Sequence, residues 1–208
     1  MKKIEIDPNK NDLQSNYKLL IGSIVPRPIG FISTISQNGV YNLAPFSFFN
    51  GACSNPPTVL FCPVLKSSDG KEKDTVKNIK STKEFVVNIV SEEFAKNMNQ
   101  TSFEYPYETD EFQKAELTPE KSKLIKPPLV KESKINMECK LTQIVEVGNK
   151  GEKGSGCIVI GEVVYFHIKE DVYKDGKIIL NKLNPIGRLG GADYCRVLDT
   201  FSIPRPEA

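Results

Sequence analysis

Tryptophan is absent from this chain, and histidine occurs only once, at position 167. The five cysteines are widely spaced and include no Cys-x-x-Cys pair: Cys53, Cys62, Cys139, Cys157 and Cys195. An odd number of scattered cysteines argues against a disulfide framework and against a zinc knuckle. Reduced thiols are therefore the default expectation, and they are typical of a cytoplasmic protein.

The chain also lacks the short motifs of several large enzyme classes. There is no Gly-x-Ser-x-Gly and no cysteine-protease signature, and a lone histidine in a β-rich run is more often structural. The glycine-rich loop 151–156 lacks the Gly-Lys-Ser/Thr ending of a phosphate-binding loop and leads into a strand. Gly187–Gly191 does not give Gly-x-Gly-x-x-Gly, so a Rossmann site is not supported either.

Charge and hydrophobic runs limit the classes of partner. The formal net charge is only +2, which gives no strong field toward nucleic acid or an anionic membrane. No apolar run approaches the length of a membrane span, and the basic residues at the start precede no apolar run, so no signal peptide is expected. We therefore expect a cytoplasmic protein with no nucleic-acid and no membrane partner.

The patterns that are present predict mainly β structure. Residues 29–36 and 41–50 form two strands around Asn38-Gly39, the strongest short hairpin signal. Further strands are expected at 58–64, 84–90, 134–147 and 157–168, and helices at 12–20, from 74 onward and at 91–100. Short strands with hairpins and few helices favour an antiparallel barrel or sandwich. With 39% hydrophobic residues the chain can bury the core of a single domain, residues 1–208.

Residues 101–134 differ in character from the rest of the chain. Four prolines interrupt this stretch, and a short helix is expected at 111–116. Long ordered loops in compact proteins are often functional. We read the stretch as an excursion packed on the barrel rather than as a separate domain.

The segment Asn42–Asn50 is apolar and aromatic without the pattern of an ordinary core strand. Pro45 removes a backbone donor, so an uninterrupted central strand is not expected. One interpretation is a distorted edge strand above a buried phenylalanine cluster. The other is a ligand-binding edge that offers backbone amides and small polar groups along a flat molecule.

The loop 66–73 gathers lysines and serines just before a helix start at Asp74 and Thr75. Helix amides, hydroxyls and ammonium groups together suit a phosphate. An exposed, solvated lysine-rich loop is the alternative interpretation. Asp74 opposes a phosphate because its carboxylate would compete for the same amides, and it would instead cap the helix or accept from a sugar hydroxyl.

An ordered set of short motifs resembles the flavin reductase-like, FMN-binding split-barrel family, including its flavoredoxin branch. The set covers most of the chain: Pro26-Arg27-Pro28-Ile29, Ser33-Thr34, Asn38-Gly39, Asn42–Asn50, Pro56-Pro57, Lys73-Asp74-Thr75 with Asn78-Ile79, Phe85–Asn88, Gly161–Val164, His167 and Arg188–Gly191 with Tyr194. The resemblance implies a homodimeric, six-stranded Greek-key split β-barrel with peripheral helices and FMN near the dimer interface.

The resemblance also implies the residues of the cofactor site. Residues 44–47 would border the isoalloxazine ring, Asn50 the ribityl chain, and Lys73 with Thr75 the phosphate. Arg27 would help at the phosphate end, and Ser33 would be an additional contact. The full implied set is Arg27, Ser33, Ala44, Pro45, Phe46, Ser47, Asn50, Lys73, Asp74 and Thr75.

A flavin carries the redox chemistry itself, which agrees with a sequence that offers no catalytic cluster and no metal site. The leading hypothesis is an oxidoreductase that takes hydride from NADH or NADPH, or electrons from a redox protein partner. Many relatives have a histidine where Gly156-Cys157 stands here, so a flavoredoxin-like electron carrier without efficient nicotinamide turnover is the alternative. A non-enzymatic binding module is the third hypothesis.

Overall fold

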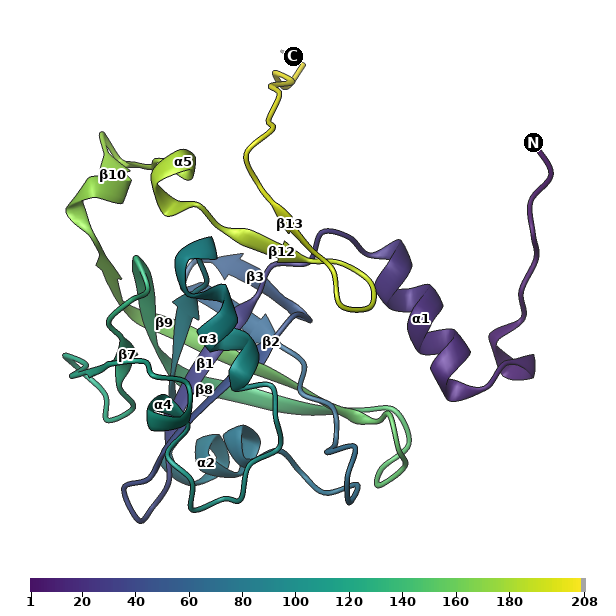
Figure 1. The fold of residues 1–208 in the computed structure, drawn as a ribbon, viewed down its shortest axis with the longest axis horizontal. Coiled ribbons are helices and arrows are strands. Elements are labelled where there is room, and N and C mark those ends of the chain that lie inside the picture. Colours follow the sequence, from purple (N-terminus) through teal and green to yellow (C-terminus); the bar gives the residue numbers. More distant parts are fainter. Residues whose placement is uncertain (207–208) are drawn as a thin grey trace.

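A computed structural model describes residues 1–206, and it is mainly β (Figure 1). Within these residues, seven strands form one antiparallel sheet in the order β2-β1-β5-β8-β9-β4-β3. The strands are β1 (Gly30–Ile35), β2 (Tyr41–Phe46), β3 (Phe49–Ser54), β4 (Pro57–Phe61), β5 (Glu84–Ile89), β8 (Ile135–Val147) and β9 (Gly156–Ile168).

The two outermost strands of this order, β2 and β3, are consecutive in the chain. Only Ser47 and Phe48 separate them, so the two ends of the sheet come together at this corner. The passage 41–50, expected as one strand, is therefore broken in two, which is why the sheet has seven strands where the resemblance implied six. Pro45 lies on β2 at the edge of the sheet, as its missing donor predicted.

The predicted hairpin between β1 and β2 is confirmed. Gly39 has a φ of +82°, a conformation that glycine adopts without steric cost. The backbone amide of Gly39 donates to the Ser36 carbonyl over 3.0 Å, and the Ser36 amide donates to the Val40 carbonyl over 2.9 Å. This turn sets the register in which Ala44 lies opposite Ile32.

The helices are short and lie outside the sheet. They are α1 (Leu13–Ser23), α2 (Asp74–Thr82), α3 (Ala95–Gln100), α4 (Glu111–Lys114) and α5 (Leu180–Leu183), with single 3₁₀ turns at Pro8–Lys10, Glu92–Phe94 and Glu170–Val172. Three two-stranded ribbons complete the fold: β6 (Pro119–Glu120) with β7 (Leu129–Val130), β10 (Tyr173–Lys174) with β11 (Lys177–Ile178), and β12 (Ile186–Arg188) with β13 (Tyr194–Arg196).

Two of the helices have bounds that differ from the ranges expected from the sequence. Asp12 caps α1, since its Oδ1 accepts from the Ser15 amide over 2.7 Å. The helix expected at 111–116 ends at Lys114, and Glu116 takes a φ of +54°. Among the described residues, no helix is both long and apolar enough to cross a lipid bilayer.

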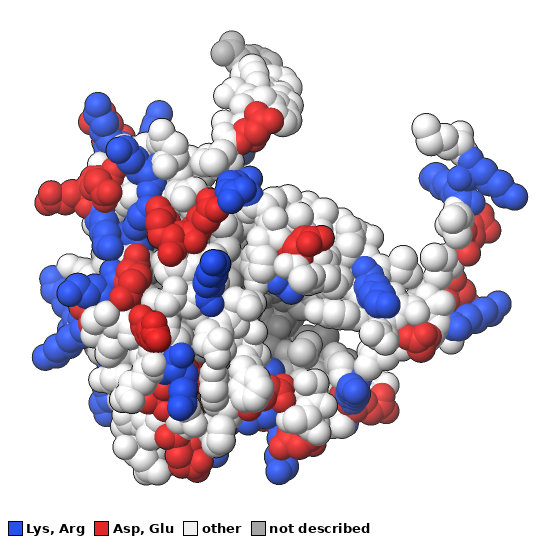
Figure 2. Space-filling model, viewed as in Figure 1, with Lys and Arg blue, Asp and Glu red and all other residues white. Residues whose placement is uncertain are grey.

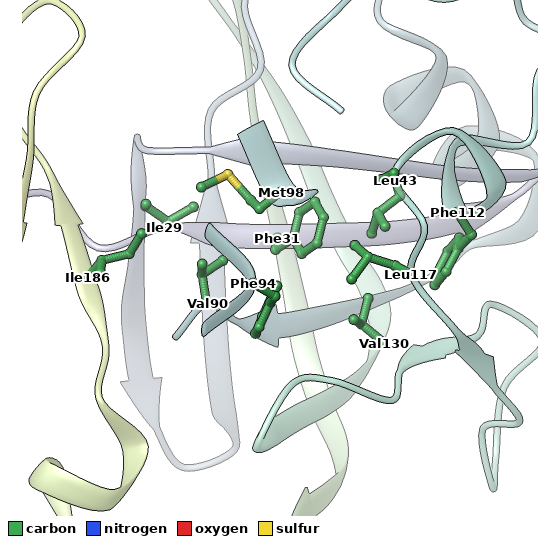
Figure 3. Packing of buried hydrophobic residues seen from close by; sticks show 11 residues of the cluster. Ile29, Phe31, Leu43, Val90, Phe94, Met98, Phe112, Leu117, Val130 and Ile186 are labelled. Atoms are coloured by element: carbon green, nitrogen blue, oxygen red, sulfur yellow. The ribbon is translucent and has the colours of Figure 1, made fainter. Parts of the chain in front are cut away.

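Two hydrophobic clusters flank the sheet. The inner one contains Phe46, Phe61 and Phe85. The ring centroids of Phe46 and Phe61 lie 5.0 Å apart, and those of Phe61 and Phe85 lie 5.5 Å apart. The outer cluster, drawn in Figure 3, joins residues of β1 and β2 to the helices and to the 101–134 excursion. Phe112, Leu117 and Val130 of the excursion are buried in it beside Phe31 and Leu43. The excursion therefore shares its core with the sheet.

Helix α1 stands away from the sheet in Figure 1. The side chains of Leu13, Tyr17 and Leu20 in α1 are each about half exposed. Figure 2 shows acidic and basic side chains interspersed over this side of the molecule. It also shows a hollow between α1 and the rest of the chain, in whose walls few charged side chains are visible.

Candidate functional site

The outward edge of β2 is covered by a buried carboxylate. Glu111 of α4 accepts a short hydrogen bond from the Leu43 amide and a 2.7 Å bond from the Asn42 side-chain amide. Strand amides alternate between the two sides of a strand, so the missing amide of Pro45 falls on the same outward side as that of Leu43. Pro45 therefore removes no hydrogen bond between β2 and β1. Beside Glu111, the outward side of β2 has no backbone donor at position 45.

Asn42 connects this edge to helix α2. Its Oδ1 accepts from the Thr75 hydroxyl over 2.8 Å and from the Thr34 hydroxyl over 3.1 Å. Asn42 and Thr75 are both buried, so these bonds are shielded from water. The start of α2 is thereby fixed against the edge of the sheet.

A pocket of about 100 Å³ lies where these elements meet. It is lined by two segments that the sequence singled out, the edge 44–46 and the helix start 73–75, together with residues from the excursion. The full lining is Asn42, Ala44, Pro45, Phe46, Lys66, Lys73, Asp74, Thr75, Thr101, Ser102, Phe103, Glu104, Tyr105 and Glu111. The structure therefore brings residues 44–46 of β2 and residues 73–75 at the start of α2 into one site.

Both lysines of the pocket are paired with carboxylates. Lys66 Nζ lies 2.8 Å from Asp74 Oδ2, and Lys73 Nζ lies 2.9 Å from Glu104 Oε1. Asp74 therefore pairs with Lys66, and its carboxylate does not cap the helix as the sequence had allowed. The amides of Ser67 and Ser68 also donate to Glu104, over 3.0 and 3.3 Å.

The two glutamates of the pocket have opposite electrostatic environments. Hydrogen bonding by Ser68, followed by that of Lys73, lowers the pKa of Glu104 to about 2. Burial raises the pKa of Glu111 to about 8, against the opposing effect of the hydrogen bond from the Leu43 amide. At neutral pH the first carboxyl is ionised and the second is mostly protonated.

Four residues of the implied cofactor set lie outside this pocket. Ser33 is fully buried, and its hydroxyl donates to the Pro128 carbonyl over 2.5 Å, so the structure places it under the excursion. Asn50 is exposed on β3, and its Oδ1 accepts from the neighbouring Gly51 amide. Ser47 is half-buried at the corner between β2 and β3.

Arg27 is the fourth of these residues, and backbone carbonyls hold its guanidinium. Its Nη1 donates to the carbonyls of Ile21 and Ile24 over 2.6 and 2.9 Å, and its Nη2 donates to that of Leu189 over 2.9 Å. Its Nε lies 3.4 Å from Ser47 Oγ. The buried guanidinium thus fastens the end of α1 near the β2–β3 corner instead of joining Lys73.

Sequence reasoning missed Glu104 and Glu111 as members of the site, and it placed Asn42 in the candidate edge 42–50 without including it in the cofactor set. Glu104 lies 31 positions from Lys73, and Glu111 lies 68 positions from Leu43. Nothing local in the sequence marks such partners. The only signal was the position of both glutamates in a long, proline-broken excursion, which is where functional loops often occur.

The single histidine lies elsewhere. His167 Nε2 is 2.6 Å from Oε1 of the fully buried Glu138 on β8. Glu138 also accepts from the amides of Lys123 and Leu124, over 2.6 and 2.7 Å. This pair holds the excursion to the sheet, so the structural interpretation of the histidine agrees with its contacts.

The donors around Glu104 are of the kind that bind an anion. A carboxylate already takes the ammonium of Lys73 and two loop amides, and the same donors suit a phosphate. The volume of about 100 Å³ is below the roughly 300 Å³ at which small-molecule pockets begin, so a ring system would extend beyond it. A second hollow of about 350 Å³ shares Lys73 and is also lined by Val64, Lys80, Val147 and Cys157.

Known proteins resemble this chain over nearly its whole length. A family model described as a flavin reductase like domain matches residues 21–182. An uncharacterized protein of Aquifex aeolicus (strain VF5) is 46% identical over 195 residues, which are 93% of this chain and 95% of that protein. Nitrilotriacetate monooxygenase component B from Bacillus cereus has a crystal structure that superposes with a TM-score of 0.93 at 37% identity, covering 98% of this chain and 100% of that one. The crystal structure of the 2-nitrobenzoate 2-nitroreductase NbaA of Pseudomonas fluorescens superposes with a TM-score of 0.86 at 28% identity. The match covers 98% of this chain and 96% of that one.

Proposed function

The chain belongs to the flavin reductase-like family, and from that premise we propose that it binds FMN at the pocket between β2 and α2 and reduces flavin with NADH or NADPH. We take its sheet as a six-stranded Greek-key split barrel in which β2 and β3 count as one bent strand. The observation that carries the proposal is the convergence of residues 44–46 and 73–75 on one pocket.

Each part of the pocket has a task in this proposal. Lys73 and the amides of Ser67 and Ser68 would hold the phosphate, and Ala44 with Pro45 would border the ring. Asn42 and Thr75 act as positioning residues, because their mutual hydrogen bond fixes the helix start against the strand. A bound flavin supplies hydride acceptance and electron transfer, so the chain needs to bind, orient and shield rather than to provide a nucleophile.

We further propose that the protein works as a homodimer whose partner copy completes the ring end of the site. The pocket of one chain is too small for a whole mononucleotide, and Asn50 at the β2–β3 corner is exposed. Tyr17 and Leu20 of helix α1, and Ile24 just after it, are exposed apolar side chains. Apolar patches of this kind mark protein interaction sites.

A flavoredoxin-like electron carrier is the second candidate function. One observation favours it: the single histidine is bound to Glu138 and is not among the residues that line the pocket. A carrier would exchange electrons with a redox protein partner and would have no efficient nicotinamide site.

Steady-state oxidation of NADH and NADPH, with FMN added, separates the two candidates. A flavin reductase turns over with at least one nicotinamide, whereas a carrier binds FMN and does not. Failure of the purified protein to take up FMN would remove both and would leave a non-enzymatic binding module.

A further inference from the structure

The carboxylate of Glu104 is bound in the pocket by the kinds of donor that would bind a phosphate. Glu104 Oε1 receives the Lys73 ammonium at 2.9 Å and the Ser67 amide at 3.0 Å. Its Oε2 receives the Ser68 amide at 3.3 Å, and the Ser67 hydroxyl lies 3.4 Å from Oε1. One ammonium, two backbone amides and one hydroxyl therefore converge on a single carboxylate.

With Glu104 in place, the pocket has no surplus of positive charge. Its two lysines, Lys66 and Lys73, are paired with Asp74 and Glu104. A phosphate entering beside Glu104 would meet a like charge and would find its donors already engaged. Without Glu104, the same donors would be free and one positive charge would be uncompensated.

We infer that Glu104 is an internal competitor for the flavin phosphate and leaves Lys73 and the Ser67-Ser68 amides when FMN binds. The inference rests on the proposed function, because it takes the phosphate end of FMN to lie at Lys73. Glu104 is then a specificity-determining residue, since it lowers the affinity for a phosphorylated flavin and not for one that lacks the phosphate.

The segment that carries Glu104 can move without opening the core. Thr101 is buried and bonded to the Met98 carbonyl, and the Tyr107 hydroxyl donates to Asn78. Between these two anchors the chain is largely at the surface, and Phe103 is 65% exposed. Besides the polar contacts of Glu104 itself, outward movement would affect the 2.8 Å hydrogen bond from Gln100 Nε2 to the Tyr105 hydroxyl and the packing of Tyr105 on Phe103, both outside the core clusters.

Protonation does not remove this competitor at ordinary pH. The hydrogen bonds of Ser68 and Lys73 lower the pKa of Glu104 to about 2, so the carboxylate stays charged wherever the protein is assayed. Substitution is therefore the way to test it. Glu104→Gln keeps the shape of the side chain and removes its charge.

The experiment compares Glu104→Gln with the wild type in fluorescence titrations with FMN and with riboflavin. Glu108→Gln is the matched control, because Glu108 is exposed, lies in the same segment and carries the same charge. We expect Glu104→Gln to bind FMN about tenfold more tightly, since one charge-assisted bond corresponds to a factor of this order. Riboflavin affinity should stay within about twofold, as should both affinities of the control.

The outcomes separate the inference from the proposed function. If both flavins bind and Glu104→Gln leaves FMN affinity unchanged or weakens it, the inference is overturned and the proposed function stands. If neither protein binds FMN or riboflavin, both fall. Glu104→Ala serves as a second variant, and its melting temperature should rise with inorganic phosphate more than that of the wild type. No such difference would also contradict the inference.

Discussion

At the scale of single residues, Asn42 determines how helix α2 sits against the sheet. One side chain accepts from Thr75 and Thr34 and donates to Glu111. All four residues are buried, so none of these groups can turn to water if its partner is removed. Buried polar networks of this kind are costly to break in part.

Asn42→Ala should therefore destabilise the protein by about 2–4 kcal/mol, because two buried hydroxyls lose their acceptor and the Glu111 carboxyl keeps only the Leu43 amide as a donor. Urea denaturation measures this loss. Asn50→Ala is the control: its exposed side chain bonds only to the next amide, and its effect should stay within roughly 0.5 kcal/mol. Equal effects of the two substitutions would show that the network contributes nothing.

The buried carboxyl of Glu111 should make the free energy of unfolding depend on pH. Its folded pKa of about 8 lies above the usual carboxyl value, so the folded state holds the proton more tightly than the unfolded chain does. Its stabilising contribution is therefore complete below pH 4 to 5 and is lost as the pH rises through 8.

Glu111→Gln keeps a neutral group at this place and should remove the dependence. Between pH 6 and pH 9 we expect the wild type to lose on the order of 2 kcal/mol relative to the variant, measured by denaturation at each pH. Parallel pH profiles of the two proteins would contradict a proton on Glu111.

At the scale of elements, local signals in the sequence predicted the hairpin and the sheet edge, but they did not predict features that depend on distant residues. Asn38-Gly39 and the proline at the sheet edge act through neighbouring residues, and each predicted its element correctly. The break at Ser47-Phe48 and the contacts of Glu104 and Glu111 depend on distant partners. Arg27 donates to the carbonyls of Ile21, Ile24 and Leu189, and its contact with the cofactor stays a prediction.

The excursion depends on Glu138 for its attachment to β8. Burial would raise the pKa of this carboxyl, but the hydrogen bonds of His167 and of the excursion amides hold it below the usual value. The stabilisation is thus present at neutral pH and is lost only as the pH falls through the folded pKa.

Glu138→Gln should loosen the amides of residues 123–125 without unfolding the sheet. We expect their hydrogen exchange to speed up by about tenfold or more, because charge-assisted bonds are replaced by neutral ones. Glu120→Gln, an exposed substitution in the same excursion, should leave the exchange unchanged. Unaltered exchange in Glu138→Gln would show that the loop is held by other contacts.

At the scale of the whole molecule, α1 carries exposed apolar side chains that the rest of the chain does not cover. If a second copy covers it, Leu20→Glu should shift the protein from dimer to monomer in size-exclusion chromatography with light scattering. Gln14→Glu introduces the same charge at another exposed position of α1 and should remain dimeric. A wild type that is already monomeric would refute the proposed homodimer.

Binding of FMN at Lys73 is the claim on which the account depends, and a fluorescence titration measures it directly. The wild type should bind one FMN per chain, and Lys73→Ala should weaken that binding by about tenfold to a hundredfold. Lys96→Ala, an exposed lysine on α3, should change nothing. A wild type that binds no FMN, or a Lys73→Ala variant with unaltered affinity, would contradict the account.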